Sequence, residues 1–176
     1  MTGKHHLIAG AVCGVCVGAS AIIAPGNTSY LIACGAVGTT MIGSLLPDID
    51  SRTSKLGSKM KITSFLANKL FGHRGFLHSP LFIVFVMWLL NFIFTKNGIQ
   101  DYSLLWQGLV FGMINHLMCD MMTKGGIPIL YPFFKLKLSF TNMKSGSKWE
   151  LIPLILVCIL TVVATYVLCK NGTFIV

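Results

Sequence analysis

The chain has 176 residues, of which 54% are hydrophobic and only 11% are charged, and its formal net charge is +9. Soluble domains carry about 25% charged residues, so this composition excludes a water-exposed globule and indicates a membrane protein. The length fits one domain, which we expect to cover residues 1–176.

Five apolar stretches follow one another along the chain. Each is close to the length of about 20 residues that crosses a hydrocarbon core of ~30 Å. The sequence therefore predicts an all-α, polytopic membrane helix bundle with about five transmembrane helices. The stretches are Leu7 to Ala24, Tyr30 to Leu46, Phe76 to Thr95, Leu104 to Met122 and Leu151 to Cys169. The run Ile127 to Phe134 is too short to span and contains two prolines, so we expect an interfacial or re-entrant piece there.

The first stretch follows His5 and His6 and carries Gly10, Gly14 and Gly18 at intervals of four. On a helix these glycines form one face that lets another helix approach closely, and the fourth stretch has a similar pair at Gly108 and Gly112. Such faces pack helices within one chain or between two copies, so an oligomer formed through them is possible.

The second stretch ends in Pro47-Asp48-Ile49-Asp50, where the proline stops the helix and two carboxylates follow. A turn there can point both carboxylates at one cation, although solvated loop aspartates or a helix cap would give the same pattern. Farther along, Ile62 to Phe71 has the spacing of a short amphipathic helix. We expect this helix to lie on the membrane surface as a flap over the site.

The third stretch is preceded by Gly72-His73-Arg74-Gly75 and has His78 in its first turn. Two imidazoles near a guanidinium favour a ligand-binding turn, and a basic anchor at the membrane surface is the alternative. The planar fork of Arg74 suits phosphate oxygens, so it could steady negative charge that develops on a substrate. A positive charge that only sets the topology is equally consistent with its position.

The fourth stretch ends with His116 and Asp120, which are four residues apart and share one face of a helix. This pair can chelate one ion. Ionisable residues inside a membrane are costly unless they are paired or bound to metal, and they usually mark function. A hydrogen bond that packs two helices together is the alternative. Glu150 leads into the fifth stretch.

The basic residues predict an orientation. With five spans, Lys4 and both long loops lie on one side, and only Lys96 and Lys170 of the 14 basic residues lie on the other. By the positive-inside rule, the N-terminus and the loops face the cytoplasm. The loops would contact anionic lipid headgroups, which accounts for the charge without a nucleic-acid partner.

Every histidine and acidic residue except Asp101 then lies at the cytoplasmic end of the bundle. Mixed imidazole and carboxylate ligands favour zinc, with manganese or iron as alternatives, over magnesium or calcium. The candidates outnumber the three or four ligands that one zinc takes, so two or more divalent metal ions are predicted. His5 is left out because neighbours at a helix start point in different directions. The candidate metal ligands are His6, Asp48, Asp50, His73, His78, His116, Asp120 and Glu150.

As a set, these motifs resemble the LexA-regulated, membrane-bound metal-dependent hydrolases of the YdjM-like family. The resemblance implies a multi-pass protein of the bacterial inner membrane. A more remote similarity, to the zinc phospholipase C and P1 nuclease superfamily, implies phosphoester hydrolysis. Leu77 departs from the pattern, because family members often carry a small polar residue there. The matching motifs are Met-Thr-x-x-x-His6, Leu-Leu-Pro-Asp48-Ile-Asp50, Gly-His73-Arg-Gly-x-x-His78-Ser, His116-x-x-x-Asp120-x-x-Thr-x-x-Gly and Gly146-x-x-x-Glu150.

We therefore predict a membrane-bound metal-dependent hydrolase that uses metal-activated water on a phosphoester in a lipid or lipid-linked substrate. Lipid is favoured because a site at the membrane surface can receive a headgroup from the leaflet and water from the cytosol. The candidate catalytic residues are Asp50, Arg74 and Glu150, with Asp50 and Glu150 as bridging ligands, general bases or supports for the ligands. A metal-ion carrier or sensor is the alternative, although transporters usually place ligands near the bilayer midplane. A structural subunit that docks a partner on its basic loops is a third reading.

Overall fold

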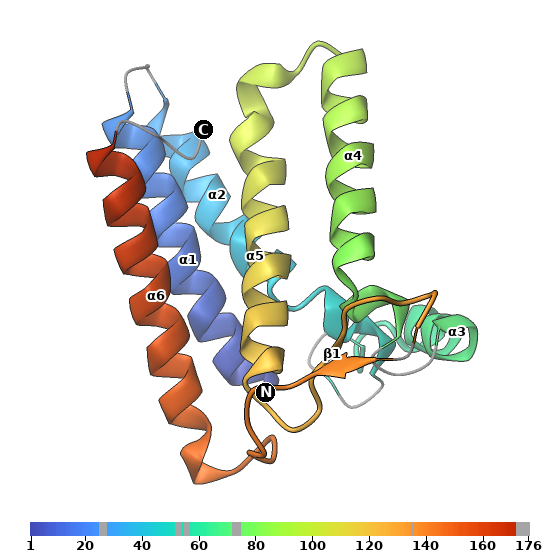
Figure 1. Cartoon of the computed structure of the whole chain (residues 1–176). Helices are drawn as coiled ribbons and strands as arrows, with labels where there is room; N and C mark the ends of the chain where they lie inside the picture. Colours follow the sequence, from blue (N-terminus) through green and yellow to red (C-terminus); the bar gives the residue numbers. More distant parts are fainter. Residues whose placement is uncertain (25–27, 52–53, 55–56, 72–74, 135, 172–176) are drawn as a thin grey trace.

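The computed structural model describes residues 1–24, 28–51, 54, 57–71, 75–134 and 136–171. Five long helices form a bundle, and a sixth, shorter helix lies beside one end of it (Figure 1). The bundle helices are α1 (Gly3–Ile23), α2 (Tyr30–Gly43), α4 (Pro80–Lys96), α5 (Ser103–Met121) and α6 (Leu151–Lys170), and the sixth helix is α3 (Lys61–Phe71). Short 3-10 turns are η1 (Pro47–Asp50), η2 (Phe76–His78), η3 (Gln100–Tyr102) and η4 (Lys148–Glu150).

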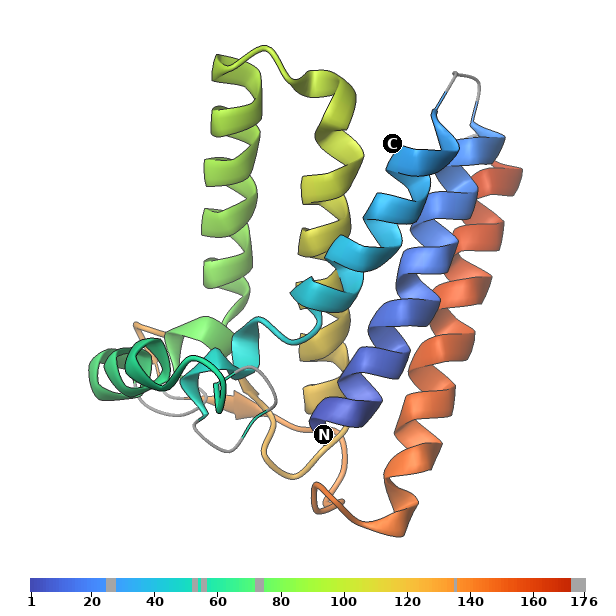
Figure 2. The same cartoon turned by 180° about the vertical axis from the view of Figure 1, so that it is seen from behind.

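Helix α5 is the centre of the packing, because it contacts α1, α2, α4 and α6, and α2 packs closely on both α1 and α5. Helix α6 packs on α1, and α4 packs on α5 at the opposite edge (Figure 2). The chain start, η1, η2, the end of α5 and the start of α6 all lie at one end of the bundle (Figure 1). The convergence expected from the sequence is thus present in the described part of the chain.

Two helix boundaries near candidate ligands differ from the predicted stretches, and the later start of α4 leaves one of these ligands outside the helix. Helix α2 ends at Gly43, and Pro47 begins the separate turn η1. Helix α4 begins at Pro80, because proline suits a first helical position and Ser79 caps the helix by accepting a hydrogen bond from the Phe82 N–H at 3.3 Å. His78 therefore lies in η2, ahead of the helix.

The run Ile127 to Phe134 forms part of a small hairpin at the same end of the bundle (Figure 1). Its strand β1 (Ile127–Pro128) pairs antiparallel with β2 (Lys137–Leu138). The expectation of an all-α fold therefore missed this short strand pair, whose two-residue strands are too brief to show an alternating pattern.

Three helical segments are long and apolar enough to cross a membrane: Gly3–Ile23, Tyr30–Asp50 and Lys148–Lys170. Helix α4 is apolar but has only 17 residues, and α5 carries the polar side chains of Asn115, His116 and Asp120. The structure thus gives a helical membrane protein with three clear candidate spans, and the count of five remains a prediction.

The glycine faces pack helices within one chain. A Cβ added at Gly14 would stand 2.8 Å from Val37 Cα, and one at Gly18 would stand 3.0 Å from the Ala33 carbonyl oxygen, so α1 closes on α2. A Cβ at Gly108 would stand 2.9 Å from the Ala36 carbonyl oxygen. The glycine faces of α1 and α5, which could have packed against a second copy of the chain, are therefore already occupied by α2.

Gly43→Ala is expected to destabilise the bundle, and Gly38→Ala is its matched control on the same helix. A Cβ at Gly43 would overlap the Leu109 carbonyl oxygen of α5, whereas nothing lies within 4 Å of a Cβ at Gly38. Overpacking costs about 1–3 kcal/mol, so thermal unfolding in detergent, followed by circular dichroism, should shift down for Gly43→Ala only. Equal melting temperatures for the two variants would contradict the close α2–α5 contact.

Candidate metal centre

Five of the eight candidate ligands come together at the end of the bundle where the chain begins. They arrive on four separate elements, since His6 is on α1, Asp48 on η1, His78 on η2, and His116 with Asp120 on α5. Four of these side chains are buried, and Asp48, whose side chain is 15% exposed, is the most accessible. The cluster is therefore largely enclosed, and Asp48 is its most exposed member.

Four ligand atoms from these residues lie close to the two imidazole Nε2 atoms. His78 Nε2 lies 3.4 Å from His116 Nε2, 3.6 Å from Asp48 Oδ1 and 3.8 Å from Asp120 Oδ2. His116 Nε2 lies 3.9 Å from each of the same two carboxylate oxygens. These five separations differ by no more than 0.5 Å.

The set fits a zinc-sized ion. Bonds of about 2.0 to 2.2 Å hold the ligand atoms of a tetrahedral zinc about 3.3 to 3.6 Å apart. Five of the six separations among the four atoms run from 3.4 to 3.9 Å, which is close to this spacing. Two imidazoles with two carboxylates are also a donor set that zinc, manganese and iron accept.

The backbone of α2 fixes the ring of His116. Its Nδ1 lies 2.7 Å from the Ser44 carbonyl oxygen. Because a carbonyl oxygen can only accept, Nδ1 carries the proton, and Nε2 offers its lone pair toward the centre. The early end of α2 produces this contact, since Ser44 follows the last helical residue, Gly43.

Asp50 faces the outer nitrogen of His78, with Oδ2 at 3.5 Å from Nδ1. This matches the way in which carboxylates commonly orient metal-binding histidines, and it favours a supporting role for Asp50. Burial alone lowers the pKa of His78, but hydrogen bonds to Asp48 and Asp50 outweigh it and raise the pKa to about 9. The surrounding carboxylates thus favour positive charge at this point, which a metal ion would also supply.

His6 stands at the inner edge of the cluster. Its ring stacks on His116 with centroids 3.8 Å apart, and its Nε2 lies 3.3 Å from Asp120 Oδ1. The buried Nδ1 of His6 has no hydrogen-bond partner among the described residues. His6, His116 and Asp120 form a second group with metal-binding geometry, and it shares His116 with the group of Asp48, His78 and His116. One lone pair serves one ion, so the geometry supports at least one metal.

Glu150 holds the start of the chain. Its Oε1 accepts a hydrogen bond from the Thr2 N–H at 2.6 Å, and its Oε2 accepts one from the Gly146 N–H at 3.2 Å. The same Oε2 lies 2.9 Å from His5 Nδ1. The Met1 amino group contacts Asp120. These contacts favour a supporting role for Glu150, one of the roles open to it from the sequence, while direct ligation stays a prediction.

The other candidates fall outside this cluster for different reasons. His73 and Arg74 lie outside the residues that the structure describes, so their predicted roles stay predictions. Asp101 lies in η3, exposed at the opposite end of the bundle (Figure 1). Apart from Asp101, the acidic and histidine residues that the structure describes all lie towards the end of the bundle that holds the ligands, as predicted.

The model of a protein family described as YdjM inner membrane protein matches residues 1–172. The chain belongs to the YdjM family. It is 38% identical over 149 residues to the uncharacterized protein YvsG of Bacillus subtilis, which covers 84% of this chain and 83% of the relative. It is 30% identical over 154 residues to the inner membrane protein YdjM of Escherichia coli, covering 85% of this chain and 76% of the relative. No solved structure matches the chain.

The YdjM family supports a membrane location and is consistent with the apolar helices. Neither the family description nor the names of these relatives state an activity. The remote similarity to zinc phospholipase C therefore remains an interpretation of the motifs.

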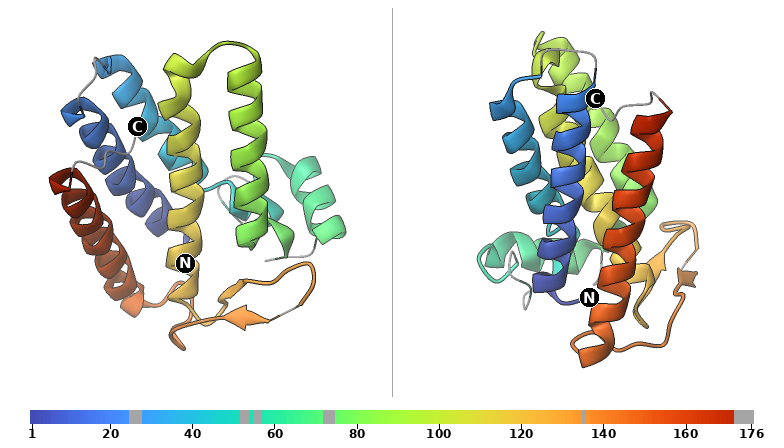
Figure 3. Two further views of the ribbon diagram at one scale, coloured as in Figure 1. Left: turned by 45° about the horizontal axis from the view of Figure 1, so that its top comes forward. Right: turned by 90° about the vertical axis from the view of Figure 1, so that its left-hand side faces the viewer.

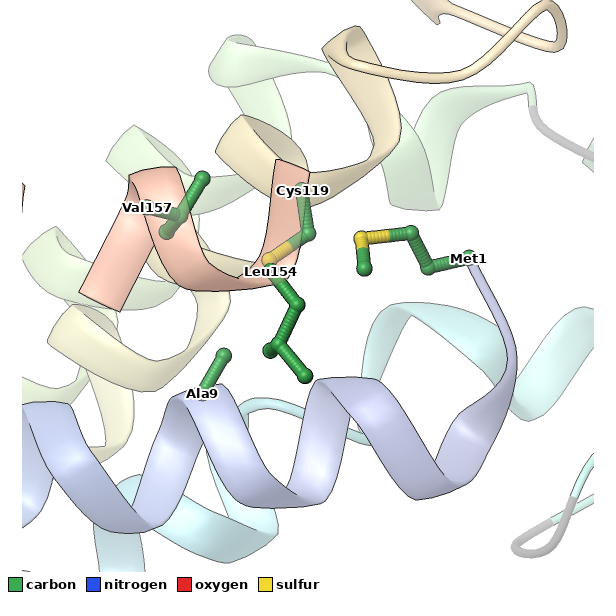
Figure 4. Packing of buried hydrophobic residues seen from close by; sticks show 5 residues of the cluster. All are labelled: Met1, Ala9, Cys119, Leu154 and Val157. Carbon is green, nitrogen blue, oxygen red and sulfur yellow. The ribbon is translucent and has the colours of Figure 1, made fainter. Parts of the chain in front are cut away.

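A cavity in the bundle is separate from the ligands of this YdjM-family site. It has a volume of about 410 Å³ between α1, α5 and α6, and none of the clustered ligands lines it. Its polar lining groups are used locally, since Asn115 Nδ2 donates to the Ala9 carbonyl at 3.1 Å and the Thr161 and Thr165 hydroxyls donate within α6. One apolar cluster lies between the cavity and the ligands: it includes Val157, which lines the cavity, and Met1, which lies beside the ligands (Figure 4). The cavity is therefore apolar and unsuited to the chemistry.

Proposed function

We propose that the chain is a membrane-embedded, metal-dependent hydrolase that cleaves a phosphoester in a lipid or lipid-linked substrate. The observation that carries the proposal is the set of four converging ligand atoms, which has one partly exposed member, Asp48. A site with one partly exposed ligand suits chemistry better than a fully closed structural site does, because a reactant must be able to reach the metal.

Asp48, His78, His116 and Asp120 would hold the ion, and His6 with Asp120 would serve a second one. The metal would polarise the ester oxygen and lower the pKa of a bound water towards about 7. The chain's own groups do the positioning: the Ser44 carbonyl holds the Nδ1 proton of His116, and Asp50 faces Nδ1 of His78. Glu150 keeps the first turn of α1, and therefore His6, in place. Arg74 would bind the phosphate oxygens through its planar fork.

The position of the ligands favours a lipid substrate. They lie at one end of the bundle, where headgroups would lie beside a five-span protein, and the positive-inside pattern places that end on the cytoplasmic side of a bacterial inner membrane. A headgroup could then enter from the leaflet while water enters from the cytosol. A metal carrier would instead be expected to gather its ligands near the bilayer midplane.

Purified protein in detergent with Zn or Mn is expected to release phosphate or headgroup from a member of a phospholipid and lipid-linked phosphate panel, and a chelator should abolish the release. Arg74→Lys keeps the charge but loses the bidentate fork, so turnover should fall about a hundred-fold while bound metal is retained. Asp101→Asn, at the opposite end of the bundle, is the control and should keep full activity.

The carrier is tested in the same preparation. Proteoliposomes that move Zn or Mn across the bilayer, without chelator-sensitive cleavage of any ester in the panel, would replace the hydrolase with the carrier. Activity that survives the chelator would remove the metal from the mechanism.

A further inference from the structure

Helix α3 turns an apolar face away from the protein, whereas an amphipathic helix in water would turn its apolar face towards the protein. Ile62 and Leu66, four residues apart on one face, are 79% and 49% exposed. Ser64 and Asn68 share another face, where Ser64 is buried, and Asn68, although exposed, donates from Nδ2 to the Asp50 carbonyl oxygen at 3.0 Å. The polar face thus contacts the protein and the apolar face points outward, which costs free energy unless something apolar covers it.

The orientation of α3 suits a membrane surface. The helix lies across the axis of the bundle at the end that holds the metal ligands (Figure 3). Amphipathic helices that bind bilayers lie in the plane of the interface, with the apolar face about 5–10 Å into the boundary between headgroups and acyl chains. A helix that crosses the bundle axis at the end of the spans has this orientation without any rearrangement.

The charge around α3 fits an anionic leaflet. Lys59, Lys61 and Lys69 are exposed on or beside the helix, and the sequence from Ser51 to Gln100 contains no acidic residue. Lysine stems can lie along apolar surface while the ammonium groups reach lipid phosphates. On another flank at the same end, Phe133 and Phe134 of the hairpin are exposed, as in an interfacial aromatic belt (Figure 3).

Contacts link α3 to the metal ligands. The Asp50 carbonyl that Asn68 holds belongs to η1, the four-residue turn that also carries Asp48. The Asp48 carbonyl accepts a hydrogen bond from the Ser54 hydroxyl at 2.7 Å, on the chain that leads to α3. A shift of α3 therefore pulls on the turn from which one carboxylate enters the ligand set and another faces His78.

We propose that α3 is seated in the headgroup layer of the leaflet at the site end, with Ile62 and Leu66 in the acyl region, and that this seat holds the Asp48–Asp50 turn in place through Asn68. The lipid contact stands without the proposed function, whereas the link to metal binding rests on the metal centre of that proposal. Asn68 is a positioning residue in this arrangement, because it acts on the ligands through the Asp50 carbonyl.

The lipid contact is tested by tryptophan fluorescence in liposomes of phosphatidylethanolamine and phosphatidylglycerol. The signal that Leu66→Trp adds to the 3 native tryptophans should be quenched by acyl-brominated lipids and protected from iodide. Lys144→Trp, at an exposed polar position in another loop, is the control and should behave oppositely. Iodide quenching of Leu66→Trp without bromolipid quenching would mean that water or another protein covers α3, and it would overturn the proposal.

The coupling is tested by zinc titration against a fluorescent chelator in nanodiscs of the same lipids. Asn68→Ala should weaken zinc binding about five-fold, the effect of one ordinary hydrogen bond, and should leave the bromolipid quenching intact. Ile62→Ser with Leu66→Ser should weaken zinc binding similarly, whereas Thr63→Ala, exposed on the same helix, should not. Unchanged affinity in the first two variants would overturn the coupling. If the unmodified protein binds no zinc, the proposed metal centre is wrong. The quenching result alone then decides whether α3 lies in the headgroup layer.

Discussion

His116→Ala is expected to lose bound metal, while His5→Ala is expected to keep it. His116 belongs to both groups of potential ligands, and its Nε2 lies within 3.9 Å of three other ligand atoms. Removing even a group that orients a ligand costs 10–100-fold in metal affinity, so the loss of this direct ligand should exceed about a hundred-fold. Elemental analysis of detergent-purified protein measures it as metal per chain.

His5→Ala controls for the loss of an imidazole at the same end of the bundle. His5 sits beside His6, but its Nδ1 lies near Glu150 and Thr2 and it belongs to neither ligand group. His6→Ala then separates one ion from two, because a second ion held by His6 and Asp120 should leave alone while the first remains. Full metal content in a folded, membrane-inserted His116→Ala variant would remove the pair of His116 and Asp120 from the site.

The sequence predicted the helices and the gathering of ligands because both rest on simple patterns. Hydropathy over about 20 residues marks a span whatever its partners are, and alternation of sides then sorts His6, His78 and Asp120 onto one end and Asp101 onto the other. The four-residue spacing of His116 and Asp120 placed them on one helical face, and in the structure His116 Nε2 lies 3.9 Å from Asp120 Oδ2.

The details that distinguish ligands from supporting residues were beyond sequence reasoning. The Ser44 carbonyl that holds His116 is a backbone group, which every residue has, so no residue type marks it. Glu150 is an acid at the expected end, yet its partners are the Thr2 and Gly146 N–H groups, and that pairing depends on how α1 meets α6. For α3, the amphipathic spacing predicted the helix, but only the contact of Asn68 with Asp50 identified the face that meets the protein.

The orientation in the membrane predicts a large difference in labelling between two introduced cysteines. In cells that produce the chain with its native cysteines replaced, Asp101→Cys is expected to react with a membrane-impermeant maleimide, whereas Lys144→Cys should react only after permeabilisation. Among the described basic residues, Lys96 and Lys170 end helices α4 and α6 at the end far from the metal ligands, while Lys144 lies in the loop beside the ligand end (Figure 1). The positive-inside rule places the lysine-rich end in the cytoplasm.

Both positions are exposed, so the comparison depends on the side of the membrane and not on burial. Labelling of Lys144→Cys in intact cells, with protection of Asp101→Cys, would mean that the orientation of the bundle in the membrane is the reverse of the predicted one. The metal centre would keep its geometry in that case, but its metal, water and headgroups would come from the outer side, and the basic loops would face a leaflet that they were not expected to meet. Labelling of both positions in intact cells would mean that an odd number of spans does not separate them, and the five-span count would be wrong.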